Sequence, residues 1–294
     1  MVRHPSRLAR LLAAGVLTLS VVGTASASNH AMVRVLHASP DAPAVDVYLD
    51  DTPVQALTNV PFGTVSGYLE VPAGAHNVKV YATGDTTTPV IDADVTLAAG
   101  AMYTVAATNA LASIEAQVIV DAPAASCDGA QVRVVHLSAD APAVDVATAG
   151  AAPADAVVKS LEYPDPTGYL TLPAGSYDLD VRLAGTTTVA LAIPDVALAA
   201  CTSYSVFAVG SAATPAVGGN ALQVVLAVDA TVEAAQGAGT TPPPTDSAPT
   251  TGVPSGSEPS ATGPGLPFAA LAALGGVVLI AASLRSAPVR RGRD

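Results

Sequence analysis

The segment Val33-Arg-Val-Leu-His-Ala-Ser-Pro-Asp-Ala-Pro-Ala-Val-Asp-Val47 is repeated 99 residues later as Val132-Arg-Val-Val-His-Leu-Ser-Ala-Asp-Ala-Pro-Ala-Val-Asp-Val146. Twelve of its 15 positions are identical in the two copies. Further matches follow in the same order: Gly67–Gly74 with Gly168–Gly175, and Met102–Val105 with Ser203–Val206. A repeat of this length predicts two tandem domains of one kind.

Each copy has the pattern of β-strands. Apolar residues alternate with period two in short segments, which are Val33/Val35/His37, Val45/Val47/Leu49, Val78/Val80, Val105/Ala107 and Val118/Val120. Turn residues such as Pro72-Ala73-Gly74 separate these segments, and no helical period is sustained. We therefore expect an all-β protein of two tandem immunoglobulin-like antiparallel β-sandwiches.

The domain boundaries follow from composition. The first sandwich is expected over residues 28–121 and the second over 130–235, with a hinge at 122–129 that is rich in Pro, Ala and Ser. Residues 236–265 consist almost wholly of Pro, Thr, Ser, Gly and Ala, which predicts a semi-extended stalk.

Both ends of the chain have the pattern of membrane-targeting segments. Three Arg, an apolar run and Ala25-Ser26-Ala27 predict a secretory signal peptide over residues 1–27. Residues 266–284 carry no charge, and as a helix of 19 residues they would extend about 28 Å, close to the thickness of a bilayer core. The tail at 285–294 is rich in Arg, which predicts a cytoplasmic C-terminus and an extracellular N-terminal part.

The net charge of −12 is unevenly distributed. The part expected outside the cell, residues 28–265, keeps five basic and 23 acidic residues, a formal charge of −18. Such a surface repels nucleic acids and favours divalent cations as counter-ions. No nucleic-acid partner is therefore expected.

The two cysteines, Cys127 and Cys201, are expected to form a disulfide, because exported proteins usually pair their cysteines. Cys127 directly precedes the first strand of the second copy and Cys201 opens a late strand of that copy. The bridge would therefore fasten the edge of the second domain alone.

Residues capable of chemistry recur in both copies, and they are the candidates for a metal or catalytic site: His37, Asp41, Asp46, His136, Asp140 and Asp145. The favoured interpretation is structural. Asp41 and Pro40 are typical of a turn, and His37 has the parity of a core position that donates to a carbonyl or to a carboxylate such as Asp46. No nucleophile motif, zinc motif or phosphate loop occurs in the chain.

Calcium is a second open interpretation, since it needs six to eight converging oxygens. Three acidic pairs could contribute: Asp50/Asp51, Asp92/Asp94 and Asp178/Asp180. None of these pairs is matched between the copies, so scattered surface acids are the favoured interpretation. No catalytic residue and no cofactor is predicted.

The repeated opening motif, followed by Tyr-Leu-x-x-Pro-Ala-Gly and a late Tyr-x-Val strand, resembles the bacterial domain of unknown function numbered 4397, found in exported proteins as tandem copies. The resemblance covers nearly all of residues 32–230, and it implies a β-sandwich at a cell surface without implying an activity. The order of signal, domains, stalk, apolar segment and Arg tail is similar to that of Gram-positive surface proteins, actinobacterial ones in particular. A sortase motif is absent, because Leu266-Pro267 continues as Phe268-Ala269-Ala270.

These patterns predict a non-enzymatic, single-pass surface protein that is held by its C-terminal helix. Its two sandwiches would stand on a flexible stalk and bind an extracellular protein or glycan, or have a structural role in the envelope. The alternative is an envelope enzyme or a calcium- or metal-dependent module that uses the repeated His and Asp positions.

Overall fold

The computed structural model describes residues 29–124, 126–213, 215–233 and 278–280, and the described residues form β-strands joined by turns and four short 3-10 helices. The elements of the first copy are β1 (His30–His37), β2 (Val45–Leu49), β3 (Thr52–Pro53), η1 (Gln55–Leu57), β4 (Leu69–Pro72), β5 (Gly74–Ala82), β6 (Ile91–Leu97), β7 (Met102–Thr108), η2 (Leu111–Ser113) and β8 (Glu115–Asp121). The elements of the second copy are β9 (Ala130–His136), β10 (Val144–Thr148), η3 (Pro153–Asp155), β11 (Val158–Leu161), β12 (Leu170–Leu172), β13 (Gly175–Leu183), β14 (Val189–Leu198), β15 (Thr202–Val209), η4 (Val217–Gly219) and β16 (Gln223–Thr231). The last strand is β17 (Val278–Ile280).

Each copy folds into a two-sheet sandwich. In the first copy, an outer sheet of order β3-β2-β5-β6 packs on an inner sheet of order β4-β1-β7-β8. The second copy repeats this layout with an outer sheet β11-β10-β13-β14 and an inner sheet β12-β9-β15-β16, to which β17 adds an edge. Alternate apolar side chains such as Val45, Val47, Val78 and Val80 fill the space between the sheets, as the period-two pattern predicts. The all-β expectation is confirmed, and the two-sheet layout of each copy fits the expected tandem sandwiches.

The expectation of purely antiparallel sheets is wrong in each inner sheet. Strand β1 pairs with β7 in parallel, with Val35 opposite Val105, and β9 pairs with β15 in the same way. Parallel neighbours need a long crossover connection. The chain between β1 and β7 provides it: β2 and β3 enter the outer sheet, β4 returns to the inner sheet beside β1, and β5 and β6 complete the outer sheet before β7.

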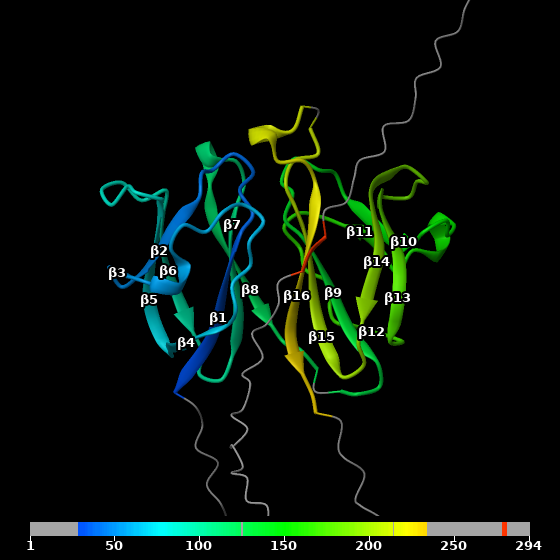
Figure 1. The fold of residues 1–294 in the computed structure, drawn as a ribbon, viewed down its shortest axis with the longest axis horizontal. Helices are drawn as coiled ribbons and strands as arrows, with labels where there is room; N and C mark the ends of the chain where they lie inside the picture. Colours follow the sequence, from blue (N-terminus) through cyan, green and yellow to red (C-terminus); the bar gives the residue numbers. More distant parts are fainter. Residues whose placement is uncertain (1–28, 125, 214, 234–277, 281–294) are drawn as a thin grey trace, which may run out of the picture.

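The two inner sheets pack against each other, so the molecule has four β-layers (Figure 1). Leu36, Ala106 and Ile119 of the first copy form one buried cluster with Val135 and Phe207 of the second. Side chains of β1 alternate between the sandwich core of their own copy and the other copy. The central strands of both inner sheets are therefore covered on both faces, and every residue of β9 and β15 is buried.

The chain termini and the loops between the sheets lie at opposite ends of the molecule. Strands β1 and β9 begin at one end, which we name the terminal end, and β8 and β16 finish there (Figure 1). The loops that follow β1, β7, β9 and β15 gather at the opposite end, which we name the loop end. The first described residue and the end of the second copy thus lie on the same side.

Several predicted segments fall outside the described residues: the signal peptide at 1–27, the stalk at 236–265, the tail at 285–294 and most of the apolar segment at 266–284. Val278–Ile280 are the three described residues of that apolar segment, and they form β17, which is antiparallel to Val224–Leu226 of β16. They are extended and not helical, because the free edge of β16 offers unpaired backbone groups to apolar residues. Within the described ranges, no helix is long and apolar enough to cross a membrane.

Candidate functional site

The repeated histidines are buried. His37 is 0% exposed and donates from Nε2 to the carbonyl of Pro43 over 2.9 Å, while His136 donates to Pro142 over 3.2 Å. Ser138 N–H donates to Nδ1 of His136, which places the proton of the neutral ring on Nε2. Burial lowers the pKa of both histidines, so both are neutral at pH 7. They fix the loops that follow β1 and β9.

Asp46 and Asp145 anchor equivalent loops. Asp46 accepts from Asn59 N over 2.6 Å and from Thr83 Oγ1 over 3.1 Å, and Asp145 accepts from Ser160 N over 2.7 Å. Asp46 was one of the two partners expected for His37, but in the structure Asp46 accepts hydrogen bonds from these loops and His37 bonds the Pro43 carbonyl. The histidine and this aspartate of each motif therefore do not form one polar site.

Asp41 and Asp140 hold the loops at the loop end. Asp41 accepts from Leu111 N over 2.6 Å, at the start of η2. Asp140 accepts from Ser211 Oγ over 2.5 Å and from Ala212 N over 3.0 Å, in the loop that leads to η4. Hydrogen bonds from Ser211 and the neighbouring backbone outweigh burial and lower the pKa of Asp140.

The acidic pairs considered for calcium are engaged within the chain. Asp51 pairs with Lys79 over 2.6 Å, and Asp92 and Asp94 both accept from the Nδ2 amide of Asn77. Asp180 pairs with Arg182 over 2.8 Å. In the part of the chain that the structure describes, no three His, Cys, Asp or Glu side chains come together in a group that could hold a metal ion.

Cys127 and Cys201 are joined in a disulfide, as expected. Cys201 N–H also donates to the carbonyl of Gly129, which ties the same two segments together through the backbone. The segment between the copies is thereby fastened to the beginning of β15 in the second copy.

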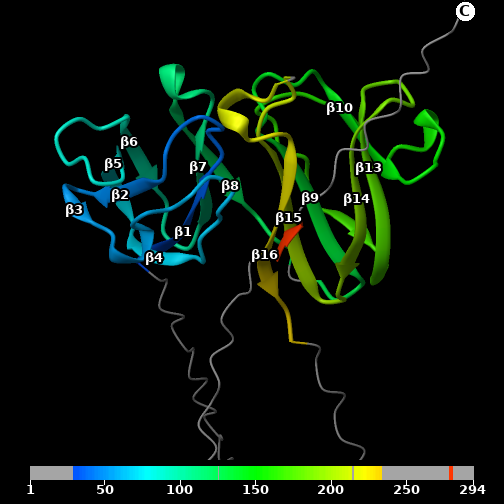
Figure 2. The ribbon, with the colours of Figure 1, turned by 45° about the horizontal axis from the view of Figure 1, so that its top comes forward.

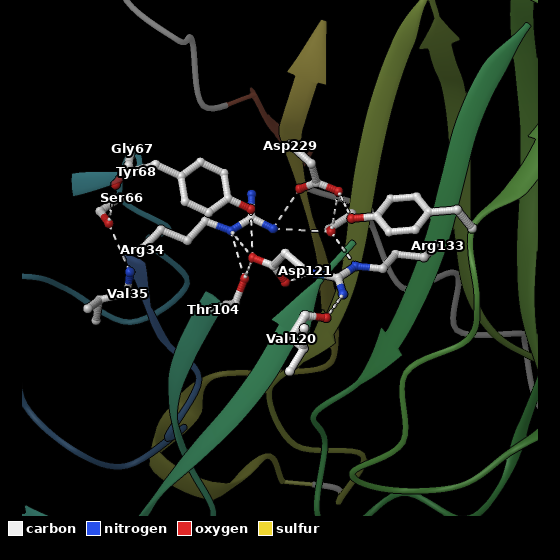
Figure 3. Close-up of polar contacts among 12 residues, drawn as sticks. Arg34, Val35, Ser66, Gly67, Tyr68, Thr104, Val120, Asp121, Arg133 and Asp229 are labelled. Atoms are coloured by element: carbon white, nitrogen blue, oxygen red, sulfur yellow. Dashed lines mark hydrogen bonds and ion pairs between the residues drawn. The ribbon is translucent and has the colours of Figure 1, made fainter. Parts of the chain in front are cut away.

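A charge cluster that the sequence analysis did not single out lies between the copies (Figure 3). Arg34 of β1 is 1% exposed and reaches across the interface, where its Nη2 lies 2.6 Å from Oδ1 of Asp229 on β16. Its Nε donates to Thr104 Oγ1 over 2.8 Å, and Nη2 donates to Ser205 Oγ over 3.1 Å. One guanidinium therefore connects both inner sheets.

Arg133 makes the reciprocal contact from the second copy. It pairs with Asp121 on β8, donates to the Val120 carbonyl over 3.0 Å and donates to Ser205 Oγ over 2.7 Å. Since Arg34 and Arg133 hold the same place in the repeated motif, the two contacts are related by an approximate two-fold symmetry. The four charges sum to zero within a space that excludes water.

Two tyrosines complete the charge cluster. Tyr68 donates to Oδ2 of Asp121 over 2.6 Å, and Tyr169 donates to Oδ2 of Asp229 over 2.6 Å. Arg34 also lies over the ring of Tyr68, with 4.7 Å between Cζ and the ring centroid. Burial is the main cause that raises the pKa of both tyrosines, so both remain protonated donors. Because its Arg and Asp side chains are buried and paired across the interface, the cluster fixes how the two copies meet.

Sequence carried a signal for this cluster. Arg is the second residue of the repeated motif and lies between two valines in both copies, and both β8 and β16 contain a Val-Asp pair near the end. A charge repeated in the middle of an apolar strand is rarely needed for solubility. The alternation within one copy does not show what this face of the strand contacts, because one sandwich alone leaves that face uncovered.

A cavity of about 210 Å³ lies between the copies at the loop end, and we name it the loop-end cavity. Its walls come from both copies: Pro40, Asn109, Ala110 and Ser113 of the first, and Leu137, Ala139, Asp140, Gly210 and Val217 of the second. The loop around η4 approaches the first copy, where Asn220 Nδ2 donates to the Pro40 carbonyl over 2.6 Å (Figure 2). Gly218, at φ +63°, lies so near the backbone of Pro40 and Asp41 that a Cβ would collide with it.

Comparison with known proteins places the chain in a family. The family model described as Domain of unknown function (DUF4397) matches residues 31–147 and 150–240. No curated protein matches the chain. A solved structure from Bacteroides eggerthii, of a protein proposed to act in cell adhesion, is 12% identical and covers 70% of this chain and 97% of its own, with a TM-score of 0.19. At that TM-score the similarity carries no argument about fold or function.

Proposed function

Because the chain belongs to the DUF4397 family, which has no assigned activity, we propose its function from its own architecture: a non-enzymatic surface module that binds an extracellular partner at its loop end. The proposal rests on one observation, which is that the chain ends and the loop-end cavity lie at opposite ends of the molecule. The described chain begins and the second copy ends at the terminal end, while the loop-end cavity lies at the opposite side. An anchor at either chain end would therefore direct the cavity away from the membrane.

The sequence supports the rest of the proposal. A signal peptide at 1–27 exports the chain, the Pro- and Thr-rich stalk at 236–265 separates the sandwiches from the bilayer, and residues 266–284 span it with the Arg tail inside. The absence of a sortase motif favours membrane retention in a cell with a Gram-positive envelope. The disulfide is in keeping with an oxidising compartment.

An enzymatic role has less support. The repeated histidines are buried, and the aspartates of the same motifs bind backbone N–H groups of loops. A general base must reach a substrate within hydrogen-bond distance. None of the six candidate residues combines an accessible nucleophile with an oriented base, so we propose binding in place of catalysis.

The test is surface labelling with membrane fractionation. On intact cells that express the full chain, a membrane-impermeant amine reagent should label Lys79 and Lys159, and the protein should sediment with membranes. A matched chain that ends at residue 265 should be released into the medium. Insertion of residues 266–284 and pairing of Val278–Ile280 with β16 exclude each other, so release of the intact chain without detergent would contradict the anchor.

A further inference from the structure

The loop-end cavity has the size of a site for a side chain. Its volume of about 210 Å³ is more than ten times the ~10–15 Å³ that one water needs. Six of its wall residues are apolar or glycine: Pro40, Ala110, Leu137, Ala139, Gly210 and Val217. These small side chains leave the space open because the turns of both copies meet there.

The polar residues of the wall already have partners. Asn109 accepts from Tyr163 OH at Oδ1 over 2.6 Å, and its Nδ2 donates to Glu115 over 3.0 Å. Both oxygens of Asp140 accept hydrogen bonds from the loop that begins at Ser211. These polar groups hold the loops in place, and most of the remaining wall is apolar or glycine. The part of a ligand that enters the cavity is therefore apolar.

Two exposed apolar side chains extend the same surface outward. Leu111 on η2 is 38% exposed and Val217 on η4 is 37% exposed. One belongs to each copy, and both helices adjoin the cavity. Exposed apolar groups beside a recess are typical of protein-interaction sites.

The charge around the cavity is of one sign. Asp140 lines it, Asp41 holds η2 next to it, and Glu115 binds its wall residue Asn109. No Lys or Arg lines the cavity. In the described ranges the three arginines are buried, so Lys79 and Lys159 are the basic side chains left to the surface. A complementary ligand therefore carries positive charge.

From these observations we infer that the loop-end cavity binds an extended polypeptide that inserts an apolar side chain and places a neighbouring Lys or Arg against the acidic rim. The inference rests on the proposed function, since it names the partner class for binding at the loop end. The apolar recess disfavours a charged group, and the rim selects against acidic peptides.

The test is an NMR titration of the full ¹⁵N-labelled chain in detergent micelles. The probe is the capped peptide acetyl-Lys-Pro-Val-Lys-amide, and acetyl-Glu-Pro-Val-Glu-amide and N-acetylglucosamine are controls. We expect the basic peptide to shift amide signals in residues 38–44, 109–115, 137–141 and 210–222. The acidic peptide should bind about threefold more weakly, because charge contacts at an exposed rim have a modest effect.

Matched variants locate the site. Ala139→Trp fills the cavity from an exposed wall position and should abolish the shifts, whereas Ala154→Trp, at an exposed alanine of η3, should not. Glu115→Lys should weaken binding of the basic peptide, whereas Glu70→Lys, on an exposed position of β4, should leave it unchanged. Unchanged spectra, equal shifts in Ala139→Trp, or shifts with the sugar and not the peptide would each overturn the inference. If the protein is labelled on intact cells but does not bind the peptide, only this inference is contradicted. If the protein is not labelled on intact cells, the proposed function is contradicted, and the result of the titration is unaffected.

Discussion

Replacing Asp229 by Asn tests the charge cluster between the copies. In the structure Asp229 pairs with Arg34 over 2.6 Å and accepts from Tyr169 OH and Ser205 Oγ, and its side chain is 0% exposed. Asn keeps the shape and removes the charge, so Arg34 remains buried with Asp121 3.7 Å away as the nearest carboxylate. Removal of one partner from a buried ion pair lowers the free energy of unfolding by about 3–5 kcal/mol.

The measurement is urea denaturation of the oxidised protein, followed by far-UV circular dichroism. Asp51→Asn is the matched control, because Asp51 pairs with Lys79 at the surface with 78% of its side chain exposed. That change should lower the free energy of unfolding by no more than about 1 kcal/mol. In a double-mutant cycle, Arg34→Met and Asp229→Asn should show a coupling of about 1 kcal/mol or more. Equal effects of Asp229→Asn and Asp51→Asn, or additive effects in the cycle, would refute the role given to the cluster.

Three further predictions concern the interface, the histidines and the disulfide. A fragment of residues 28–124 exposes the interface side chains Leu36, Ile119, Arg34 and Asp121. Because the interface is approximately symmetric, two such fragments should form a dimer, which analytical ultracentrifugation measures. A fragment that stays monomeric at high concentration would contradict the symmetry. The pKa of His37 and of His136 is lowered in the folded state, so the unfolded chain binds more protons as the pH falls below 6.5. The free energy of unfolding should therefore decrease from pH 7 to pH 5. His37→Gln should decrease the slope of this pH dependence, and an unchanged slope would contradict the prediction. The double change Cys127→Ser and Cys201→Ser opens a link across 74 residues and should lower the free energy of unfolding by about 4 kcal/mol in the chain-entropy model, measured by urea denaturation, whereas a loss below about 1 kcal/mol would contradict it.

The alternation of apolar residues predicted the sandwiches because the side chains that alternate are buried against strands of the same copy. The alternation Val33/Val35/His37 places those side chains toward the core of the first copy, and the structure buries Val35 and His37 there. The disulfide was predictable for a similar reason, since the chain has two cysteines and features of export.

The interface between the copies was not predictable from the same alternation. Arg34 and Leu36 lie on the other face of β1, and whether that face meets solvent or protein depends on contacts more than 80 residues away. On β8 the outcome also differs from the pattern, because Val118 and Val120 are 39% and 62% exposed, while Ile119 and Asp121 face the second copy. The parallel β1–β7 pair was missed because strand direction depends on the path of the chain between sheets, which periodicity does not record.

The two copies form one body, joined by packed inner sheets and a buried charge cluster. Differential scanning calorimetry of the full oxidised chain measures whether they also unfold as one. We expect a single transition in which the calorimetric and van't Hoff enthalpies agree, because neither copy can unfold without exposing the face of the other. Two resolved transitions, with the first copy melting before the disulfide-bonded second copy, would contradict it.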